Sequence, residues 1–255
     1  MSEQGRWAGR NTGKDAIRNA IWRRLEEEGY AIGPAFSHIP NFVGADVAAW
    51  RLAQTDQWKN AATVKCNPDP PQIPVRLRAL YDGKLLYAPV PYLTEGFPYL
   101  KIDPVTLKKK GVSFELAATS EGYQRYGERV EFEDVAPLDF CVVGSVAVGR
   151  LGGRTGKGAG FADLETAIFR ELGTIRADTP IATTVHSCQL VDDSHVVIEA
   201  HDSPLDFIAT EAELIVTDNR DHRPPGVVWE RVQADQFETI PFLSALKHRM
   251  TSRKG

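Results

Sequence analysis

The feature that most constrains this fold is a pair of apolar runs separated by a glycine-rich stretch and one amphipathic segment. The runs, at 138–148 and 181–191, carry many β-branched residues, which favour strands. Between them, GGRTGKGAGFAD at 152–163 holds five glycines, and 162–173 has apolar residues at helical spacing. Strand, glycine loop, helix and strand form a βαβ unit. The pattern therefore predicts an α/β fold: a Rossmann-like, three-layer arrangement with a mostly parallel sheet and helices on both faces.

Other segments extend this alternation of strands and helices. Apolar spacing predicts helices over 14–28 and about 44–56, and in the second of these Val47, Trp50 and Leu52 are the residues offered to the core. Residues 104–136 are charged and weakly patterned, so we expect surface excursions with one short helix. Short apolar runs predict further strands at 62–67, 84–90, 97–103, 213–218 and 226–232.

The end of the chain is expected to stand apart from the sheet. Residues 241–250 read as a terminal helix, and the residues after Met250 are basic and polar. We therefore predict a single α/β domain over 1–235, followed by a C-terminal helix and basic tail over 236–255.

Composition narrows the class of partner. The net charge is −4 and the 30 basic residues are dispersed, which argues against nucleic acid and leaves small anionic ligands open. No apolar run reaches the roughly 18 residues that a membrane helix needs, and the first residues lack the apolar core of a secretory signal. We expect a cytoplasmic protein without a membrane partner. Three widely spaced cysteines in apolar segments predict reduced thiols in the core.

The glycine-rich stretch has the chemistry of an anion-binding loop. A loop between a buried strand and a helix lies where α/β sheets bind ligands, and glycines allow backbone amides to approach a phosphate. Arg154 and Lys157 add positive charge, the arginine as a bidentate donor. The loop is not a Walker A motif, because Leu151 and Gly158 stand where glycine and serine or threonine are required, and Phe161 breaks the dinucleotide fingerprint. A flexible surface loop gives the same pattern, so both interpretations stay open at this point.

The order of residues in the loop is more specific than its composition. It resembles the signature of the 5-formyltetrahydrofolate cyclo-ligase family, also called methenyltetrahydrofolate synthetases. Two further motifs agree in order: a K-x-x-x-R pair in the first helix, Lys14 and Arg18, and the segment EAHDSPLDFIAT from residue 199. The resemblance extends from residue 12 to about 218. The loop motif R-x-G-x-G-x-G-aromatic-x-D is formed by Arg154, Gly156, Gly158, Gly160, Phe161 and Asp163.

The resemblance implies a cyclo-ligase or NagB-like architecture and a set of site residues. Lys14 and Arg18 are expected to reach the phosphates of ATP from the first helix. Asp163 is expected to bind Mg²⁺, and Arg154, Lys157 and Asp163 are the expected catalytic residues. The expected nucleotide-binding loop comprises Arg154, Gly156, Lys157, Gly158, Gly160 and Phe161.

The resemblance also implies a reaction. ATP activates the formyl group of 5-formyltetrahydrofolate as a phosphorylated intermediate, and ring closure gives 5,10-methenyltetrahydrofolate. The sequence departs from the family at Phe161 and Ala162, which replace paired tyrosines. NPDPPQ at 67–72 and GKLLYAP at 83–89 resemble a divergent branch, the synthetase-domain-containing proteins. Two alternatives therefore stand beside the cyclo-ligase: an ATP-dependent enzyme with a non-folate substrate, one connected with thiamine being an example, and a nucleotide- or pterin-binding protein without turnover.

Six other residues receive structural or peripheral roles. Ser187, His186 and Cys188 lie in an apolar run, so we expect them to line the core or a pocket as parts of a strand. Glu165 is expected to be a first-turn acid favoured by the helix dipole. His201 and Asp202 match the family segment; for Asp202, a place at the border of the site and a turn-forming role are equally open.

Overall fold

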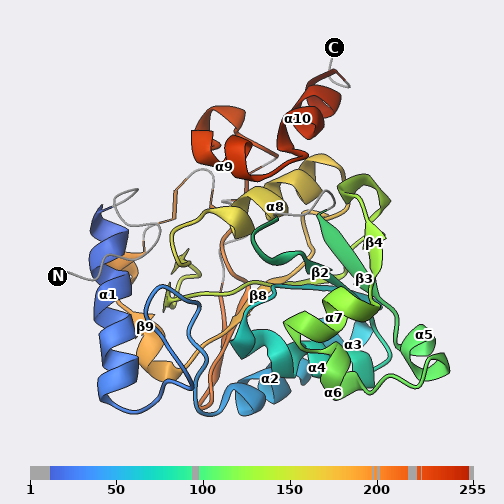
Figure 1. Cartoon of the computed structure of the whole chain (residues 1–255). Helices are drawn as coiled ribbons and strands as arrows, with labels where there is room; N and C mark the ends of the chain where they lie inside the picture. The colour runs from blue at the N-terminus through green and yellow to red at the C-terminus, as the bar shows by residue number, and fades with distance from the viewer. Residues whose placement is uncertain are drawn as a thin grey trace.

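An eight-stranded sheet runs through the centre of the protein (Figure 1). The computed structural model describes residues 12–93, 98–196, 198–199, 202–217, 223–224 and 226–252. The order of strands is β11-β10-β8-β5-β1-β2-β3-β4. The five strands from β10 to β2 are parallel, whereas β11, β3 and β4 are antiparallel additions at the edges. The strands are β1 (Thr63–Cys66), β2 (Leu85–Pro89), β3 (Tyr99–Ile102), β4 (Glu128–Val130), β5 (Phe140–Val142), β8 (Ile181–Thr184), β10 (Phe207–Ala209) and β11 (Leu214–Val216).

Helices cover both faces of this sheet, which confirms the predicted three-layer α/β fold. In β5, Phe140 and Val142 belong to the core on one face, and Cys141 belongs to the core on the other. This alternation is the period of two that a strand imposes. Figure 1 shows α2 and α4 on one side of the sheet and α8, α9 and α10 on the other. The helices are α2 (Ala45–Ala53), α4 (Ile73–Tyr81), α8 (Phe161–Glu171), α9 (Ala234–Thr239) and α10 (Leu243–Ser252).

A smaller three-stranded sheet carries the first helix. It contains β7 (Arg154–Thr155), β6 (Ala147–Gly149) and β9 (Leu190–Val191), in that order. The apolar face of α1 (Thr12–Glu27), with Ile21, Trp22 and Leu25, packs against this sheet in a third core. The β6–β7 hairpin leads directly into the glycine loop. The packing of α1 therefore brings the start of the chain beside that loop.

The two long apolar runs are not single strands, which corrects the sequence prediction. The first run ends its strand at Val142 and then passes into β6 of the small sheet. The second ends at Thr184, turns through a 3-10 helix at Ser187–Gln189, and enters β9. The segment 226–232 is not a strand either, because it holds a 3-10 helix at Trp229–Arg231. Strand β10, in contrast, was not predicted.

The face that α2 turns to the core was also predicted wrongly in part. Leu52 is fully buried as expected, but Val47 and Trp50 are 38% and 50% exposed. The buried face is made of Ala45, Ala48 and Ala49 with Leu52. Small side chains let this helix approach α4 and the sheet closely, and the larger residues point outward. The helix ends at Ala53, and a separate helix, α3 (Asp56–Asn60), follows it.

The segment 104–136 is more ordered than its sequence suggests. It forms α5 (Pro104–Lys109), α6 (Phe114–Ala117), α7 (Ser120–Tyr126) and the edge strand β4. Phe114, Tyr123 and Phe132 are buried. The prediction of surface excursions with one helix was therefore wrong. The buried aromatic residues of this segment are isolated among charged residues, so they give no periodic apolar pattern in the sequence.

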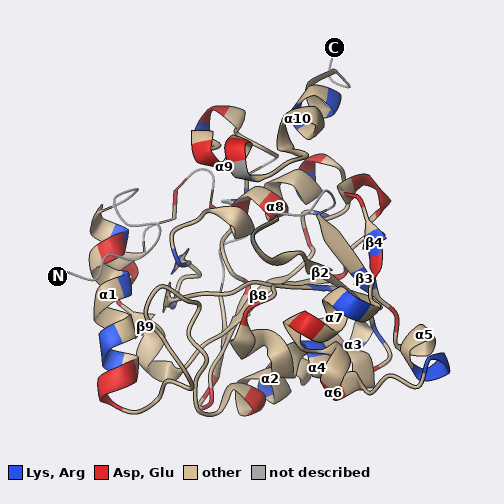
Figure 2. Cartoon of the chain, in the orientation of Figure 1, with Lys and Arg blue, Asp and Glu red and all other residues tan. Residues whose placement is uncertain are grey.

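The C-terminal helices join the core that lies beneath α8. Leu243, Leu246 and Met250 of α10 are buried there, so the predicted terminal helix is confirmed. The division of the chain at residue 235 stays a prediction, and the last three residues of the predicted basic tail lie outside the described residues. Figure 2 shows acidic and basic residues interspersed along the chain, with both signs on α1. Within the described residues, no helix is long and apolar enough to span a membrane.

All three cysteines are free and buried, as the sequence predicted. Burial raises the pKa of Cys66 and Cys188 to about 11 and that of Cys141 to about 12. The reactive species is the thiolate, so at pH 7.5 we expect iodoacetamide to alkylate the native protein at least ~100 times more slowly than free cysteine. Mass spectrometry should show three modifications after unfolding in urea. Rapid alkylation of the native protein would contradict this expectation.

Candidate functional site

A cavity of about 410 Å³ lies at the carboxyl ends of β1, β2 and β5. Its walls come from α1, the segment 67–69 after β1, the glycine loop with the start of α8, and the segment 226–236. Ligands of open α/β sheets bind at this end of the strands. The position of the cavity therefore agrees with the binding edge expected from the sequence.

The glycine loop adopts a shape that requires glycine at two positions. Gly158 has φ of +107° and Gly160 has φ of +73°, a region that residues with a Cβ rarely occupy. Gly160 is the N-cap of α8, so the first amides of an eleven-residue helix follow directly after the loop. The loop thus ends at a helix N-terminus, which favours anions.

Side chains from both ends of the chain fix the loop. Arg18 Nε donates a hydrogen bond to the Gly156 carbonyl at 2.7 Å, and Gln236 Nε2 donates to the Ala159 carbonyl at 3.0 Å. Arg18 also pairs with Asp15. Burial lowers the pKa of Arg18 and the Asp15 carboxylate opposes that shift, but an arginine stays charged in proteins. The first helix therefore contacts the loop directly, with its charge intact.

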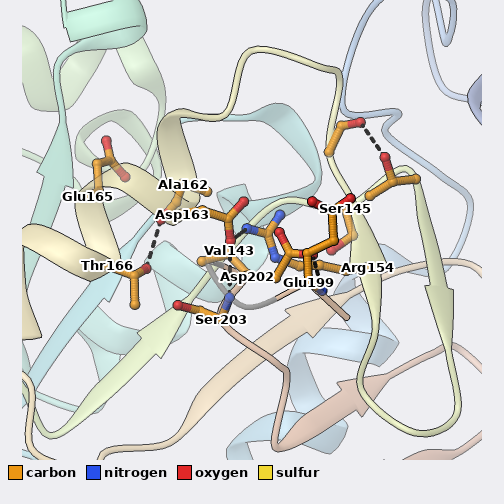
Figure 3. A network of polar contacts seen from close by, with 12 residues as sticks. Val143, Ser145, Arg154, Ala162, Asp163, Glu165, Thr166, Glu199, Asp202 and Ser203 are labelled. Atoms are coloured by element: carbon orange, nitrogen blue, oxygen red, sulfur yellow. Dashed lines mark hydrogen bonds and ion pairs between the residues drawn. The ribbon is translucent and has the colours of Figure 1, made fainter. Parts of the chain in front are cut away.

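Arg154 and Asp163 point toward one another across the start of α8 (Figure 3). Arg154 Nη2 donates to Asp163 Oδ1 at 2.6 Å, and the arginine side chain is 5% exposed. The Ser203 amide donates to the same carboxylate oxygen at 3.3 Å. Arg154 Nε is buried and has no hydrogen-bond partner among the described residues. Arg154 as a residue lines the cavity, so its guanidinium group lies beside the space where an anionic ligand would bind.

Two lysines of the predicted site are paired with carboxylates. Lys14 Nζ lies 3.3 Å from Glu199 Oε1 and 3.4 Å from Asp202 Oδ2. Lys157 Nζ donates to Asp69 Oδ1 at 3.0 Å. Each lysine thus connects its own wall of the cavity to an acidic residue of another segment. An incoming anion would compete with these carboxylates.

Asp202 fills both roles that the sequence left open. It lines the cavity, and its Oδ2 accepts a hydrogen bond from the Glu199 amide at 3.0 Å, which forms a turn. His201 lies outside the described residues. Figure 3 shows Glu199 and Asp202 beside Arg154.

The structure brings every predicted site residue to one cavity, although their roles stay predictions. The lining residues from the predicted set are Lys14, Arg18, Arg154, Gly156, Lys157, Gly158, Gly160, Phe161 and Asp163.

The sequence analysis did not predict a buried ion pair that joins β1 to α8. Lys65 Nζ of β1 lies 2.8 Å from Glu165 Oε2 of α8, and both side chains are at most 3% exposed. Lys65 also donates to Asn67 Oδ1. The interpretation of Glu165 as a first-turn acid is therefore wrong, because its carboxylate neutralises a lysine inside the protein. The signal in the sequence was a lone lysine in the apolar run TVKC.

Asp69 lines the cavity, but the sequence analysis did not include it among the site residues. It lies in the NPDPPQ segment, which the sequence marked only as a branch feature, and its side chain is 9% exposed. The segment is fixed by Arg76 of α4, which is fully buried.

His186, Ser187 and Cys188 form no part of the cavity lining found among the described residues. His186 stacks on Tyr30 with ring centroids 4.1 Å apart, and its Nδ1 accepts a hydrogen bond from the Cys188 amide. Burial lowers the pKa of His186 despite the nearby Glu211. The expected core role is confirmed for His186 and Cys188, whereas Ser187 is only partly buried. The three residues cap and form a 3-10 helix instead of a strand.

Fold and site together define a class: an α/β protein with a basic glycine loop at the carboxyl edge of a mostly parallel sheet. The chain belongs to the 5-formyltetrahydrofolate cyclo-ligase family, whose model matches residues 10–211. It is similar to the methenyltetrahydrofolate synthase domain-containing proteins of Bos taurus, at 37% identity, and Homo sapiens, at 36%. Both alignments cover 238 residues, which is 92% of this chain and 62% of each relative. The chain thus spans less than two thirds of these relatives.

The fold has a solved counterpart. The structure of 5,10-methenyltetrahydrofolate synthetase from Aquifex aeolicus matches with a TM-score of 0.52 at 20% identity, covering 81% of this chain and 93% of that chain. At this identity the likeness shows the fold alone. The family membership connects the chain with ligase-type, folate-related enzymes.

Proposed function

We propose that this protein is an ATP- and Mg²⁺-dependent ligase that cyclises 5-formyltetrahydrofolate, or a related formyl-bearing heterocycle, to the 5,10-methenyl product. The observation that carries the proposal is the meeting of Arg18, Arg154 and Lys157 around one glycine loop at a helix N-terminus. All three residues line the same cavity and supply positive charge for an anion there. A cytoplasmic location belongs to the proposal, because ATP and reduced folates are available there.

The residues suit a reaction whose main demand is charge neutralisation. The formyl oxygen takes the terminal phosphoryl group of ATP and ADP leaves. N10, the exocyclic amine nitrogen, then attacks the activated carbon and loses its proton, and the carbon–oxygen bond breaks to release phosphate. Arg154 and Lys157 would hold the phosphoryl oxygens, with Arg154 as a planar, bidentate donor. Arg18 would keep the loop closed through its bond to the Gly156 carbonyl. Alignment and electrostatic stabilisation supply most of the rate in phosphoryl transfer.

Within the described residues, no group of three or more Asp, Glu, His or Cys side chains could hold a metal ion, so Mg²⁺ would be held by one carboxylate together with phosphate oxygens and water. Asp163 lies next to the loop with a side chain that is 23% exposed, and carboxylates are ligands that Mg²⁺ prefers. Asp163 would hold the ion, which would neutralise phosphate charge. Lys14 lines the same cavity from α1 and would contact the outer phosphates.

One departure from the family's sequence pattern favours a second candidate function. Phe161 and Ala162 stand at the start of α8 where the resembling family has paired tyrosines, so the wall beside the heterocycle offers no hydroxyl there. An ATP-dependent enzyme of the same fold with a non-folate substrate is therefore the alternative, and a binding protein without turnover is the third candidate.

A direct assay separates these functions. Purified protein with ATP, Mg²⁺ and 5-formyltetrahydrofolate should develop the near-ultraviolet absorbance of the methenyl product. Phosphate release without this absorbance, in the presence of another heterocycle, would favour the alternative substrate. ATP binding without either signal would favour the binding protein.

Replacing Lys157 with alanine is expected to weaken ATP binding by roughly 1.5–3 kcal/mol, the range for a hydrogen bond to a charged group. Isothermal titration calorimetry with ATP and Mg²⁺ measures this change. Lys59→Ala is the matched control, because Lys59 is an exposed lysine of α3 with a side chain that is 56% exposed. An unchanged ATP affinity in Lys157→Ala would remove Lys157 from the site.

A further inference from the structure

One wall of the cavity comes from a segment that lies beyond the residues matched by the family model. That match ends at residue 211, whereas the segment 226–236 lines the cavity with apolar, amide and basic side chains. The segment therefore adds binding groups to those of the glycine loop and the first helix.

Both ends of this segment are attached to α8 and its loop. The Val227 amide donates to Glu171 Oε2 at 2.9 Å, and Gln236 Nε2 donates to the Ala159 carbonyl at 3.0 Å. Between these two bonds, Trp229 packs against the core beneath α8. The side chains that this segment offers to the cavity are therefore held in place by α8.

The 3-10 helix at Trp229–Arg231 places Val228 and Arg231 on the same side of the segment. The Arg231 amide donates to the Val228 carbonyl at 2.9 Å, and residues three apart in a 3-10 helix lie one above the other. Both residues line the cavity. Both are also exposed, Val228 to 39%. They present an apolar surface and a cation side by side where the cavity meets solvent.

Arg231 differs from the other cations of the cavity in having no carboxylate partner. Among the described residues, the lysines and arginines that line the cavity are Lys14, Arg18, Arg154, Lys157 and Arg231. The first four each pair with a carboxylate. The Arg231 side chain makes no ion pair and no hydrogen bond with any residue that the structure describes. Its charge is therefore available for an anionic group of a ligand.

We infer that Arg231 is a specificity-determining residue that binds a carboxylate on the tail of the heterocyclic substrate. The tail leaves the cavity over Val228, with an aromatic ring against the valine and the carboxylate against the guanidinium group. In 5-formyltetrahydrofolate the groups follow in this order, because a benzoyl ring joins the heterocycle to a glutamate. The inference rests on the proposed function, because it assumes that the heterocycle occupies this cavity.

A carboxylate of the substrate suits this position better than a phosphate of ATP. The proposed phosphate site already has its own cations, gathered around the glycine loop at the N-terminus of α8. Arg231 belongs to a separate segment and is exposed, where a flexible tail can reach it while the heterocycle stays inside. A guanidinium group binds a carboxylate through two parallel hydrogen bonds, so it distinguishes a carboxylate from a neutral amide.

The test compares two ligands of the same shape and different charge: 5-formyltetrahydrofolate and its diamide, in which both glutamate carboxylates are carboxamides. Calorimetry measures the affinity of each ligand in the presence of a saturating non-hydrolysable ATP analogue and Mg²⁺, and the affinity of the analogue alone. The unmodified protein should bind the acid about three- to tenfold more tightly than the diamide, as expected for an exposed pair with bidentate geometry. In Arg231→Ala the acid and the diamide should bind about equally well. Arg231→Lys should keep part of the preference, because an ammonium supplies charge without the planar set of donors.

Arg23→Ala is the matched control. Arg23 is an exposed arginine of α1 and is not among the described residues that line the cavity, so this variant should keep the preference of the unmodified protein. A structural effect of Arg231→Ala would weaken binding of both ligands alike and leave the ratio of their affinities unchanged. Circular dichroism checks that each variant folds.

The outcomes separate this inference from the proposed function. If the protein forms the methenyl product but shows no preference for the acid, or keeps that preference in Arg231→Ala, the inference is wrong while the proposed function stands. If Arg231→Ala weakens binding of the ATP analogue alone and leaves the preference intact, Arg231 binds a phosphate and the inference is wrong in the same way. If the unmodified protein binds neither the analogue nor 5-formyltetrahydrofolate, the proposed function fails and the inference fails with it.

Discussion

Lys65→Met is expected to destabilise the protein by about 3–5 kcal/mol, the usual effect of breaking a buried ion pair from one side. The methionine leaves the Glu165 carboxylate inside the protein, with a side chain that is 3% exposed, and without its cation. The Asn67 side chain loses a donor at the same time. The change in free energy of unfolding is measured by urea denaturation followed by circular dichroism.

The double variant Lys65→Met/Glu165→Leu separates the pair from simple loss of a side chain. With both charges removed, most of the lost stability should return, because apolar residues of similar volume replace buried pairs well. Lys101→Met is the control in β3, two strands away from β1, where the pair with Glu128 is partly exposed and contributes about 0–1 kcal/mol. A change below about 1 kcal/mol in Lys65→Met, the level of a surface pair, would show that Glu165 finds another partner.

Arg154→Ala is expected to lower kcat by about 10²–10³-fold, the effect of removing one preorganised donor from a site where charge develops. Arg154 lines the cavity and donates through Nη2 to Asp163. Arg154→Lys should recover little, because an ammonium lacks the planar set of donors. Turnover is followed by the absorbance of the methenyl product.

The neighbouring arginine provides the control for this prediction. Arg150 directly follows β6 in the turn of the β6–β7 hairpin. Its side chain is 56% exposed and pairs with Glu213. Arg150→Ala should keep kcat within about twofold, because exposed ion pairs contribute little. A kcat of Arg154→Ala within about threefold of the unmodified protein would exclude Arg154 from the stabilisation of charge.

The parts of the fold that follow a local sequence pattern could be predicted from the sequence. The βαβ unit around α8 was recognised because β-branched runs, glycines and helical spacing agree from residue 138 to residue 191. The meeting of α1 with the glycine loop was predicted from ordered motifs, and the bond from Arg18 to the Gly156 carbonyl places them in contact.

The missed features depend on contacts that no local pattern records. In the sequence, Lys65 is a charged residue that interrupts an apolar strand. It can be buried because its ammonium group contacts Glu165, which lies 100 residues later in the chain. Asp69 acquires its partner in the same way, across 88 positions. For α2, the size of Trp50 suggested burial, but closeness to the sheet selected alanines. Burial of a helix face depends on the space available as well as on hydrophobicity.

The hydrogen bond from Gln236 to the Ala159 carbonyl has a consequence for the design of shortened fragments. The side chain that closes the loop belongs to α9, beyond the strands, and the segment 226–236 supplies a wall of the cavity. A shortened fragment that stops at residue 235 would keep every strand of the central sheet yet lose that closure. Experiments on ligand affinity should therefore use the protein with its last two helices intact.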